Sequence, residues 1–172
     1  DVVRSRGLGD VYKRQILNNR IINMPRGKVL GGTSSINGML YVRGQAQDYD
    51  GWAQAGNKGW SFEEVLPYFK KSVQTHFGKC RHDEGYYGET GELHISPPRT
   101  TYAVLDQFIE AAGRRGYRAY ADYNGKRQDG FNYFQLAQKN GLRHSSYQAF
   151  IAPVLKKRQN LTQLSAAHVL AL

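Results

Sequence analysis

A segment rich in glycine and hydroxyl side chains, RGKVLGGTSSINGMLYVRG, occupies residues 26–44. Gly31 and Gly32 are adjacent, and glycine adopts positive φ and exposes its amide N–H without a Cβ in the way. Thr33, Ser34 and Ser35 add hydroxyl donors, and Asn37 both donates and accepts. This chemistry suits a polar, anionic, flat ligand such as a pyrophosphate or a planar ring system. The same residue types also fit an ordinary turn with a helix cap.

A second segment, residues 76–91, gathers side chains that resemble a metal site in composition: His76, Cys80, His82, Asp83 and Glu84. Their spacing matches no ligand template, so we predict no metal site. The segment has no apolar period and is rich in glycine, which predicts a surface loop. Its cysteine is the single one in the chain, which excludes an internal disulfide and a zinc ribbon.

The composition is that of a folded protein of about one domain. The chain has 172 residues, of which 40% are hydrophobic and 12% aromatic, as in a globular domain and not a disordered tail. No stretch approaches eighteen consecutive apolar residues, and no signal peptide opens the sequence. We therefore expect no integral membrane segment and a cytoplasmic location.

The formal net charge of +10 is one signal of a nucleic-acid partner. The 24 Lys and Arg residues are nevertheless spread along the chain, with only short clusters. Such clusters are typical of helix ends and solvated faces. We therefore predict no nucleic-acid partner, and a basic nucleic-acid-binding domain is the third of our hypotheses.

Several elements must position these residues. Ser61 and Glu64 form a capping box that predicts a helix over 61–74, kinked or shortened by Pro67. A shorter helix is expected over 48–55, with Trp52 directed inward and Gly56 at its end. An amphipathic pattern predicts a third helix from Val104 to Gly116, and Ser145 or Ser146 caps a fourth that reaches about Lys157.

The strands are expected between these helices. Residues 93–95 alternate and precede two prolines, and 131–138 form an apolar and aromatic run that turns at Asn140-Gly141. Residues 161–172 complete the set with a further alternating segment. The fold class is therefore mixed α and β (α/β or α+β), without internal repeats.

Residues 1–15 stand apart from this pattern. They contain Gly7-Leu8-Gly9, but no apolar strand precedes these residues and no third glycine opens a helix, so they are not a dinucleotide fingerprint. The stretch RSRGLGDVYKRQ resembles a junk translation found at the ends of incompletely assembled sequences. We expect 1–15 to be a non-native leader on an internal fragment.

Residues 27–37, followed by Tyr41, Gly44 and Asp50, resemble the first signature of the glucose–methanol–choline (GMC) family of flavin oxidoreductases. The resemblance covers 16–172 and is closest to choline-dehydrogenase-like and aliphatic-alcohol-dehydrogenase-like members. Further segments that resemble the family are DYDGW at 48–52, GWS at 59–61, LPYFKK at 66–71, GEL at 91–93, DYNG at 122–125, QDG at 128–130 and NLT at 160–162.

The resemblance implies FAD as the cofactor. It assigns cofactor contacts to Val29, Gly31, Gly32, Ser34, Asn37, Gly38, Met39 and Leu40 in the loop, and to Val169 near the end of the chain. It also implies a partial FAD-binding Rossmann-like domain with part of a substrate domain. The expected divisions are the end of an FAD-binding segment at 16–60, an excursion at 61–159 and a return strand at 160–172.

In the family, an alcohol is oxidised to a carbonyl by hydride transfer to flavin N5. The substrate implied here is a small alcohol, choline-like or primary aliphatic, and the electron acceptor stays open. Some members bond the flavin through a histidine at the position of Ile36, so we predict a noncovalent flavin.

The catalytic histidine of the family lies near the C-terminus of its full chain, so we assign no catalytic residue here. The fragment is not expected to fold or act alone. A nonenzymatic phosphate- or nucleotide-binding module is the second hypothesis.

Overall fold

A computed structural model describes residues 12–13, 21–22, 25–76 and 83–167. Short strands and helices are interspersed along the chain, so the predicted mixture of α and β is confirmed. In order they are β1 (Tyr12–Lys13), β2 (Ile21–Ile22), the 3-10 turn η2 (Gly32–Ser35), β3 (Leu40–Tyr41), α1 (Ala46–Gln54), α2 (Phe62–Ser72), β4 (Val73–Thr75), β5 (Leu93–Ile95), α3 (Ala103–Arg114), β6 (Gln135–Leu136), β7 (Gln138–Lys139), β8 (Leu142–Arg143), the π-helical turn η3 (Tyr147–Ile151) and α4 (Ala152–Leu155).

Strands β3 to β8 lie close together and form what we call the hub. β4 and β5 pair in parallel, while β3 pairs with β6 and β7 with β8 in antiparallel fashion. Leu136 of β6 lies opposite Leu40 and also exchanges two backbone hydrogen bonds with Ser96, which follows β5. Val73 and Ile95 are completely buried where β4 and β5 meet. The core therefore sits at this hub.

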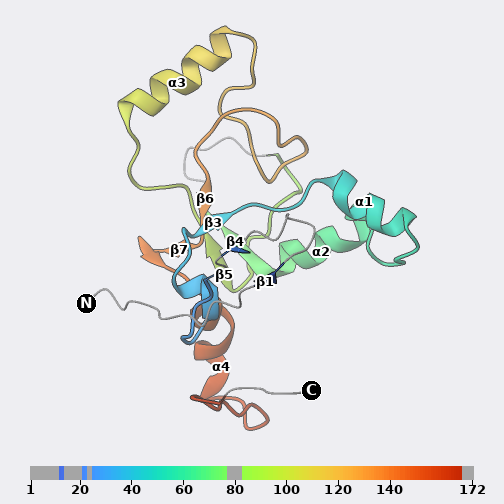
Figure 1. The fold of residues 1–172 in the computed structure, drawn as a ribbon, viewed down its shortest axis with the longest axis vertical. Coiled ribbons are helices and arrows are strands. Elements are labelled where there is room, and N and C mark those ends of the chain that lie inside the picture. Colours follow the sequence, from blue (N-terminus) through green and yellow to red (C-terminus); the bar gives the residue numbers. More distant parts are fainter. Residues whose placement is uncertain (1–11, 14–20, 23–24, 77–82, 168–172) are drawn as a thin grey trace.

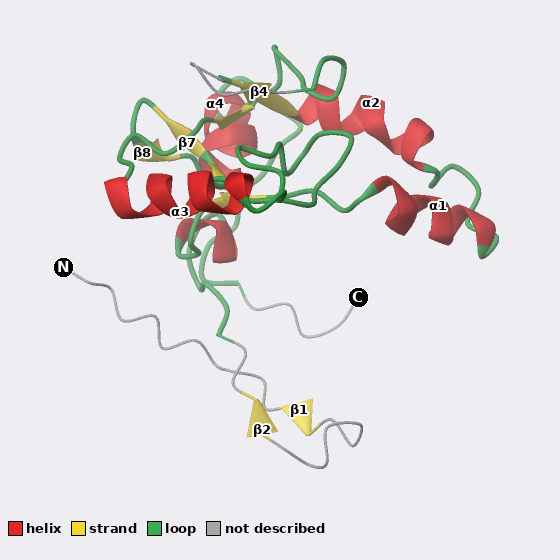
Figure 2. Ribbon diagram, turned by 90° about the horizontal axis from the view of Figure 1, so that it is seen from above, coloured by secondary structure: helices red, strands yellow, loops and turns green. Residues whose placement is uncertain are grey.

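The helices radiate from the hub (Figures 1 and 2). α3 extends to one side, α1 and α2 extend together to the other, and α4 leaves in a third direction. This arrangement leaves much apolar surface exposed, including Val104 and Phe108 on α3. None of the described helices is long and apolar enough to cross a membrane.

The predicted helical pair is present as α1 and α2. Ser61 accepts from the N–H of Glu64, whose carboxylate accepts from the N–H of Ser61 at 3.1 Å, as the capping box predicted. α2 runs through Pro67 and ends at Ser72. The inward direction expected for Trp52 is wrong: its side chain is 50% exposed and packs edge-on against Trp60. The cause is that α1 projects away from the hub.

The predicted turn at Asn140-Gly141 is confirmed. Both residues have positive φ, 53° and 81°, as a two-residue hairpin of the I′ type requires, and they join β7 to β8. The strand expected over 131–138 is instead limited to β6, which pairs with β3 and Ser96, because after Ala137 the chain continues as β7 with a separate partner, β8. The fourth helix is confirmed as η3 and α4.

Two other expectations need correction. The part of 76–91 that the structure describes is not a plain surface loop, because Tyr87 is buried and Gly91 donates to the carbonyl of Val73 at 3.0 Å. Gly88 and Gly91 have no Cβ, which lets this segment lie directly on the backbone where α2 ends and β4 begins. Residues 161–167 form no strand, since no described neighbour pairs with them. Val169 and His168 lie outside the described residues.

Candidate functional site: the glycine-rich loop

The loop of residues 29–40 begins with a tight turn. Gly31 and Gly32 have φ of 88° and 56°, so the positive φ predicted for both is confirmed. The N–H of Gly32 donates to the carbonyl of Val29 at 2.8 Å, and the carbonyl of Thr33 then accepts from Asn37 at 2.9 Å. These bonds close η2 and reverse the chain towards β3.

The hydroxyl groups of the loop bind its own backbone. Ser34 donates to the carbonyl of Gly31 at 2.6 Å, and Ser35 donates to the carbonyl of Leu30 at 2.7 Å. The hydroxyl of Thr33 accepts from the N–H of Gly27 at 3.2 Å. These side chains therefore shape the loop. The hydroxyl proton of Ser34 is used within the loop, so Ser34 does not offer it to a cofactor.

Asn37 also serves the loop. Its Oδ1 accepts from the N–H of Met39 at 3.0 Å and from Nη1 of Arg143 at 3.0 Å. Met39 has a φ of 63°, which is unfavourable for a residue with a side chain. The carboxamide thus stabilises a strained turn immediately before β3.

The loop exposes both open backbone and apolar side chains. A Cβ at Gly32 would meet no described atom within 4 Å, and one at Gly38 would meet only Cγ of Leu40 at 3.9 Å. In the same loop, Val29 is 45% exposed, Ile36 43% and Leu40 56%. A planar ligand can therefore approach the backbone here and cover apolar surface at the same time.

A buried polar network lies directly after β3. Arg43 is 6% exposed, and its backbone N–H donates to Oδ1 of Asn124 at 2.7 Å. Its guanidinium donates to the hydroxyl of Tyr41 at 2.9 Å and to the carbonyl of Tyr86 at 2.5 Å. Asn124 returns to β3 by donating to the carbonyl of Tyr41 at 3.0 Å. The network therefore ties the end of the loop to residues 122–125.

Asp122 continues this network. It accepts from the hydroxyl of Tyr87 and, at 3.0 Å, from the N–H of Asp83. Burial, and then the hydrogen bond and charge of Asp122, raise the pKa of Tyr87 far above its ordinary value. The phenol is therefore held as a proton donor to the carboxylate.

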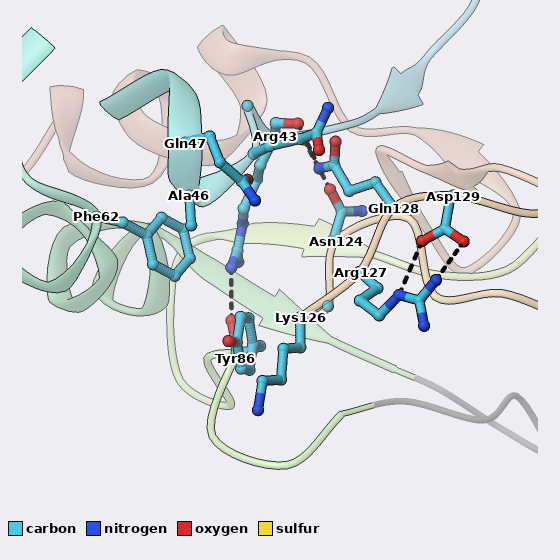
Figure 3. Close-up of a pocket in the computed structure, with 13 residues that line it drawn as sticks. Arg43, Ala46, Gln47, Phe62, Tyr86, Asn124, Lys126, Arg127, Gln128 and Asp129 are labelled. Carbon is cyan, nitrogen blue, oxygen red and sulfur yellow. Dashed lines mark hydrogen bonds and ion pairs between the residues drawn. The ribbon is translucent and has the colours of Figure 1, made fainter. Parts of the chain in front are cut away.

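A cavity of about 440 Å³ opens beside the network (Figure 3). Its wall includes Gln128, which donates to the carbonyl of Arg43 at 2.8 Å, and the ion pair of Arg127 with Asp129 at 2.8 Å. None of the loop residues predicted to bind the cofactor lines it. The segments DYNG and QDG were noted in the sequence, but the sequence did not show that Asn124 and Gln128 in them both bind Arg43.

Three histidines lie close together: His76 follows β4, His94 is in β5 and His144 follows β8. Nε2 of His76 lies 3.0 Å from Nδ1 of His94, and Nδ1 of buried His144 accepts from the N–H of His94 at 3.1 Å. Burial is the largest cause that lowers the pKa of His94 and of His144. Among the described residues no group of His, Cys, Asp and Glu is arranged to hold a metal ion. Cys80 and His82 lie outside the described residues.

Comparison with known proteins agrees with the predicted family. A family model described as GMC oxidoreductase matches residues 6–172. The chain therefore belongs to the GMC oxidoreductase family, and the family together with its structural neighbours indicates FAD as the cofactor.

Similar curated proteins include two bacterial enzymes called oxygen-dependent choline dehydrogenase. The chain is 44% identical to that of Sinorhizobium fredii over 141 residues, which are 82% of this chain and 25% of the relative. It is 44% identical to that of Rhizobium etli over 142 residues, again 25% of the relative. The chain thus spans about a quarter of the length of these relatives.

Solved structures with the same fold include two oxidoreductases. An FAD-dependent oxidoreductase from Chaetomium thermophilum superposes with a TM-score of 0.72 at 28% identity, covering 81% of this chain and 26% of that one. Pyridoxine 4-oxidase from Mesorbium loti gives 0.73 at 28% identity, covering 86% and 29%. Both agree with the predicted fold class.

Proposed function

We propose that this chain is the part of a larger FAD-dependent alcohol oxidoreductase that carries the flavin-contacting loop. The observation that carries the proposal is the exposed surface of residues 29–40, which combines open backbone at Gly32 and Gly38 with exposed Val29, Ile36 and Leu40. An isoalloxazine ring needs this combination, because it is flat and apolar on its faces and polar at its edge.

In the proposed enzyme the bound FAD supplies a hydride acceptor for oxidation of an alcohol to a carbonyl. The residues of this chain bind and orient the ring. Backbone at Gly38 and Met39 lies along it, while the side chains of Leu40 and Ile36 exclude water from its surface. We assign no catalytic residue within the chain.

The substrate class that we propose is a choline-like alcohol, with primary aliphatic alcohols as the alternative. The support is the 44% identity to choline dehydrogenases of Sinorhizobium fredii and Rhizobium etli.

The test uses the full-length enzyme purified with FAD. We expect choline, added without oxygen or another acceptor, to bleach the visible flavin absorption, and added oxygen or quinone to restore it. No bleaching with choline or with any primary aliphatic alcohol would overturn the proposed reaction.

A matched pair of variants tests the loop itself. Gly38→Val places a side chain on the open backbone, and we expect it to abolish FAD retention. Gly51→Val is the control, since a Cβ at that exposed position in α1 meets nothing within 4 Å. Equal FAD content in the two variants would contradict the assignment of Gly38.

A further inference from the structure

A second segment of the chain, residues 143–146, is hydrogen-bonded to the loop of residues 29–40. Nη1 of Arg143, the last residue of β8, donates to the carbonyl of Ser34 at 3.1 Å and to Oδ1 of Asn37 at 3.0 Å. One nitrogen therefore joins η2 to the turn that follows it. The donors and acceptors involved are separated by 106 residues or more along the chain.

Ser146 adds a second attachment next to the first. Its N–H donates to Oγ of Ser34 at 3.0 Å, and its hydroxyl donates to the carbonyl of Gly31 at 3.2 Å. Ser34 donates to the same carbonyl of Gly31. The two serines and this carbonyl form one closed set of hydrogen bonds that fixes the start of η2.

Residues 143–146 are themselves fixed by strand pairing and hydrogen bonds. β8 pairs with β7 through the Asn140-Gly141 turn, and the N–H of His144 donates to the carbonyl of Ala137 at 2.9 Å. Ser145 is 5% exposed, and its N–H donates to Oε1 of Gln148 at 3.0 Å. The segment thus offers a rigid base to the loop.

The strained part of the loop depends on this base. Met39 keeps its positive φ while its N–H donates to Oδ1 of Asn37, and Arg143 holds that same oxygen in place. A carboxamide without the guanidinium is free to rotate, and the turn before Leu40 then loses its support. The outward backbone at Gly38 lies in the middle of this turn.

We infer that Arg143 and Ser146 are positioning residues, which hold the loop of residues 29–40 in the shape that binds the flavin. The inference rests on the proposed function, and it assigns to these residues a role through Ser34 and Asn37. Neither residue is required to touch the cofactor. Their hydrogen bonds engage Gly31, Ser34 and Asn37 and leave the backbone at Gly32 and Gly38 open to a ligand.

The experiment compares variants of the full-length holoenzyme. Arg143→Ala is expected to raise the dissociation constant of FAD at least tenfold and to shift the visible absorption bands of the flavin that remains bound. Ser146→Ala is expected to have a smaller effect in the same direction. Arg143→Lys should restore part of the affinity, because a single ammonium can replace the single nitrogen that makes both bonds.

Two matched controls separate positioning from general damage. Arg114→Ala removes an arginine at the end of α3, and Ser72→Ala removes a hydroxyl that donates to the carbonyl of Phe69 in α2. Both are expected to keep the wild-type dissociation constant and spectrum. Hydrogen exchange of the amides at 32–39 in the apoprotein should quicken in Arg143→Ala and not in the controls.

The outcomes are distinct. Wild-type affinity, spectrum and amide protection in Arg143→Ala would overturn the inference while leaving the proposed function intact. A wild-type protein that binds no FAD would refute the proposed function, and the inference with it. If Arg143→Ala does not fold, Ser146→Ala decides by the same measurements, since it removes only a hydroxyl.

Discussion

The carboxamide of Asn124 takes the place of a strand neighbour for Arg43. It accepts from the backbone N–H of Arg43 at 2.7 Å and donates to the carbonyl of Tyr41 at 3.0 Å. Asn124 is 3% exposed, so water does not compete for these groups. One side chain therefore satisfies two buried backbone groups at the exit from β3.

Asn124→Ala is expected to destabilise the full-length protein. The variant leaves the N–H of Arg43 and the carbonyl of Tyr41 unpaired, and each buried unsatisfied group costs about 1–3 kcal/mol. We expect the free energy of unfolding to fall by about 2–4 kcal/mol. Urea unfolding measures the change. Asn57→Ala is the control, because its exposed amide donates to the carbonyl of Trp52. An equally large fall in the free energy of unfolding for Asn57→Ala would contradict the prediction.

His144 should make the stability depend on pH in the acid range. Burial and then the charge of Lys139 lower the pKa of His144 from its ordinary value of 6.5. The unfolded chain thus takes up this proton at a higher pH than the folded one. The stability linked to neutral His144 is therefore fully present above about pH 6.5 and declines as the pH falls below that value. Protonation also removes the acceptor at Nδ1 for the N–H of His94.

The variant His144→Asn tests this dependence, since its Oδ1 can accept from the same N–H without titrating. We expect its unfolding free energy to decline less than that of the wild type between pH 7 and pH 5. Chemical denaturation at several pH values provides the measurement. Parallel curves for the two proteins would show that His144 is not the group responsible.

Gly88→Ala is expected to be strongly destabilising. A Cβ at this position would overlap the carbonyl oxygen of Lys70 and lie 2.5 Å from that of Val73, and both are backbone atoms that cannot rotate away. We expect a loss of about 3 kcal/mol in the free energy of unfolding. Gly51→Ala in α1 is the control, and it should be neutral or stabilise by up to about 1 kcal/mol. Similar thermal midpoints for Gly88→Ala and wild type would be inconsistent with this packing.

The flavin of the full-length enzyme is expected to be noncovalent. Ile36, at the position of the histidine that attaches the flavin in some members of the family, has no nucleophilic atom and is 43% exposed. Acid precipitation should therefore release FAD into the supernatant, where its fluorescence is measured. FAD that stays with the pellet would disprove the prediction.

Local signals in the sequence predicted local structure well. The capping box of Ser61 with Glu64 and the turn at Asn140-Gly141 need only residues three or fewer apart, and both are present. The positive φ of Gly31 and Gly32 likewise follows from the residue type. Strand pairing was harder, because a strand exists only where a partner lies beside it. Residues 161–167 alternate in sequence, but no described strand pairs with them.

The candidate site was predictable only in part. The loop of residues 29–40 was recognised from its composition and from its resemblance to a family signature. Its support by Arg143 and the pairing of Arg43 with Asn124 were not, because they join residues 106 and 81 positions apart. No short pattern encodes such contacts, and a buried arginine differs from an exposed one only through the surrounding fold.

The attachment of Ser34 to Ser146 also sets an order of events during synthesis. The two residues are 112 positions apart, so the glycine-rich loop leaves the ribosome long before its base exists. At about 5–20 residues per second, the delay is roughly 6–22 s. During that interval the exposed Val29, Ile36 and Leu40 have no fixed shape to occupy. The loop of residues 29–40 can therefore reach its folded shape only after residue 146 has been synthesised.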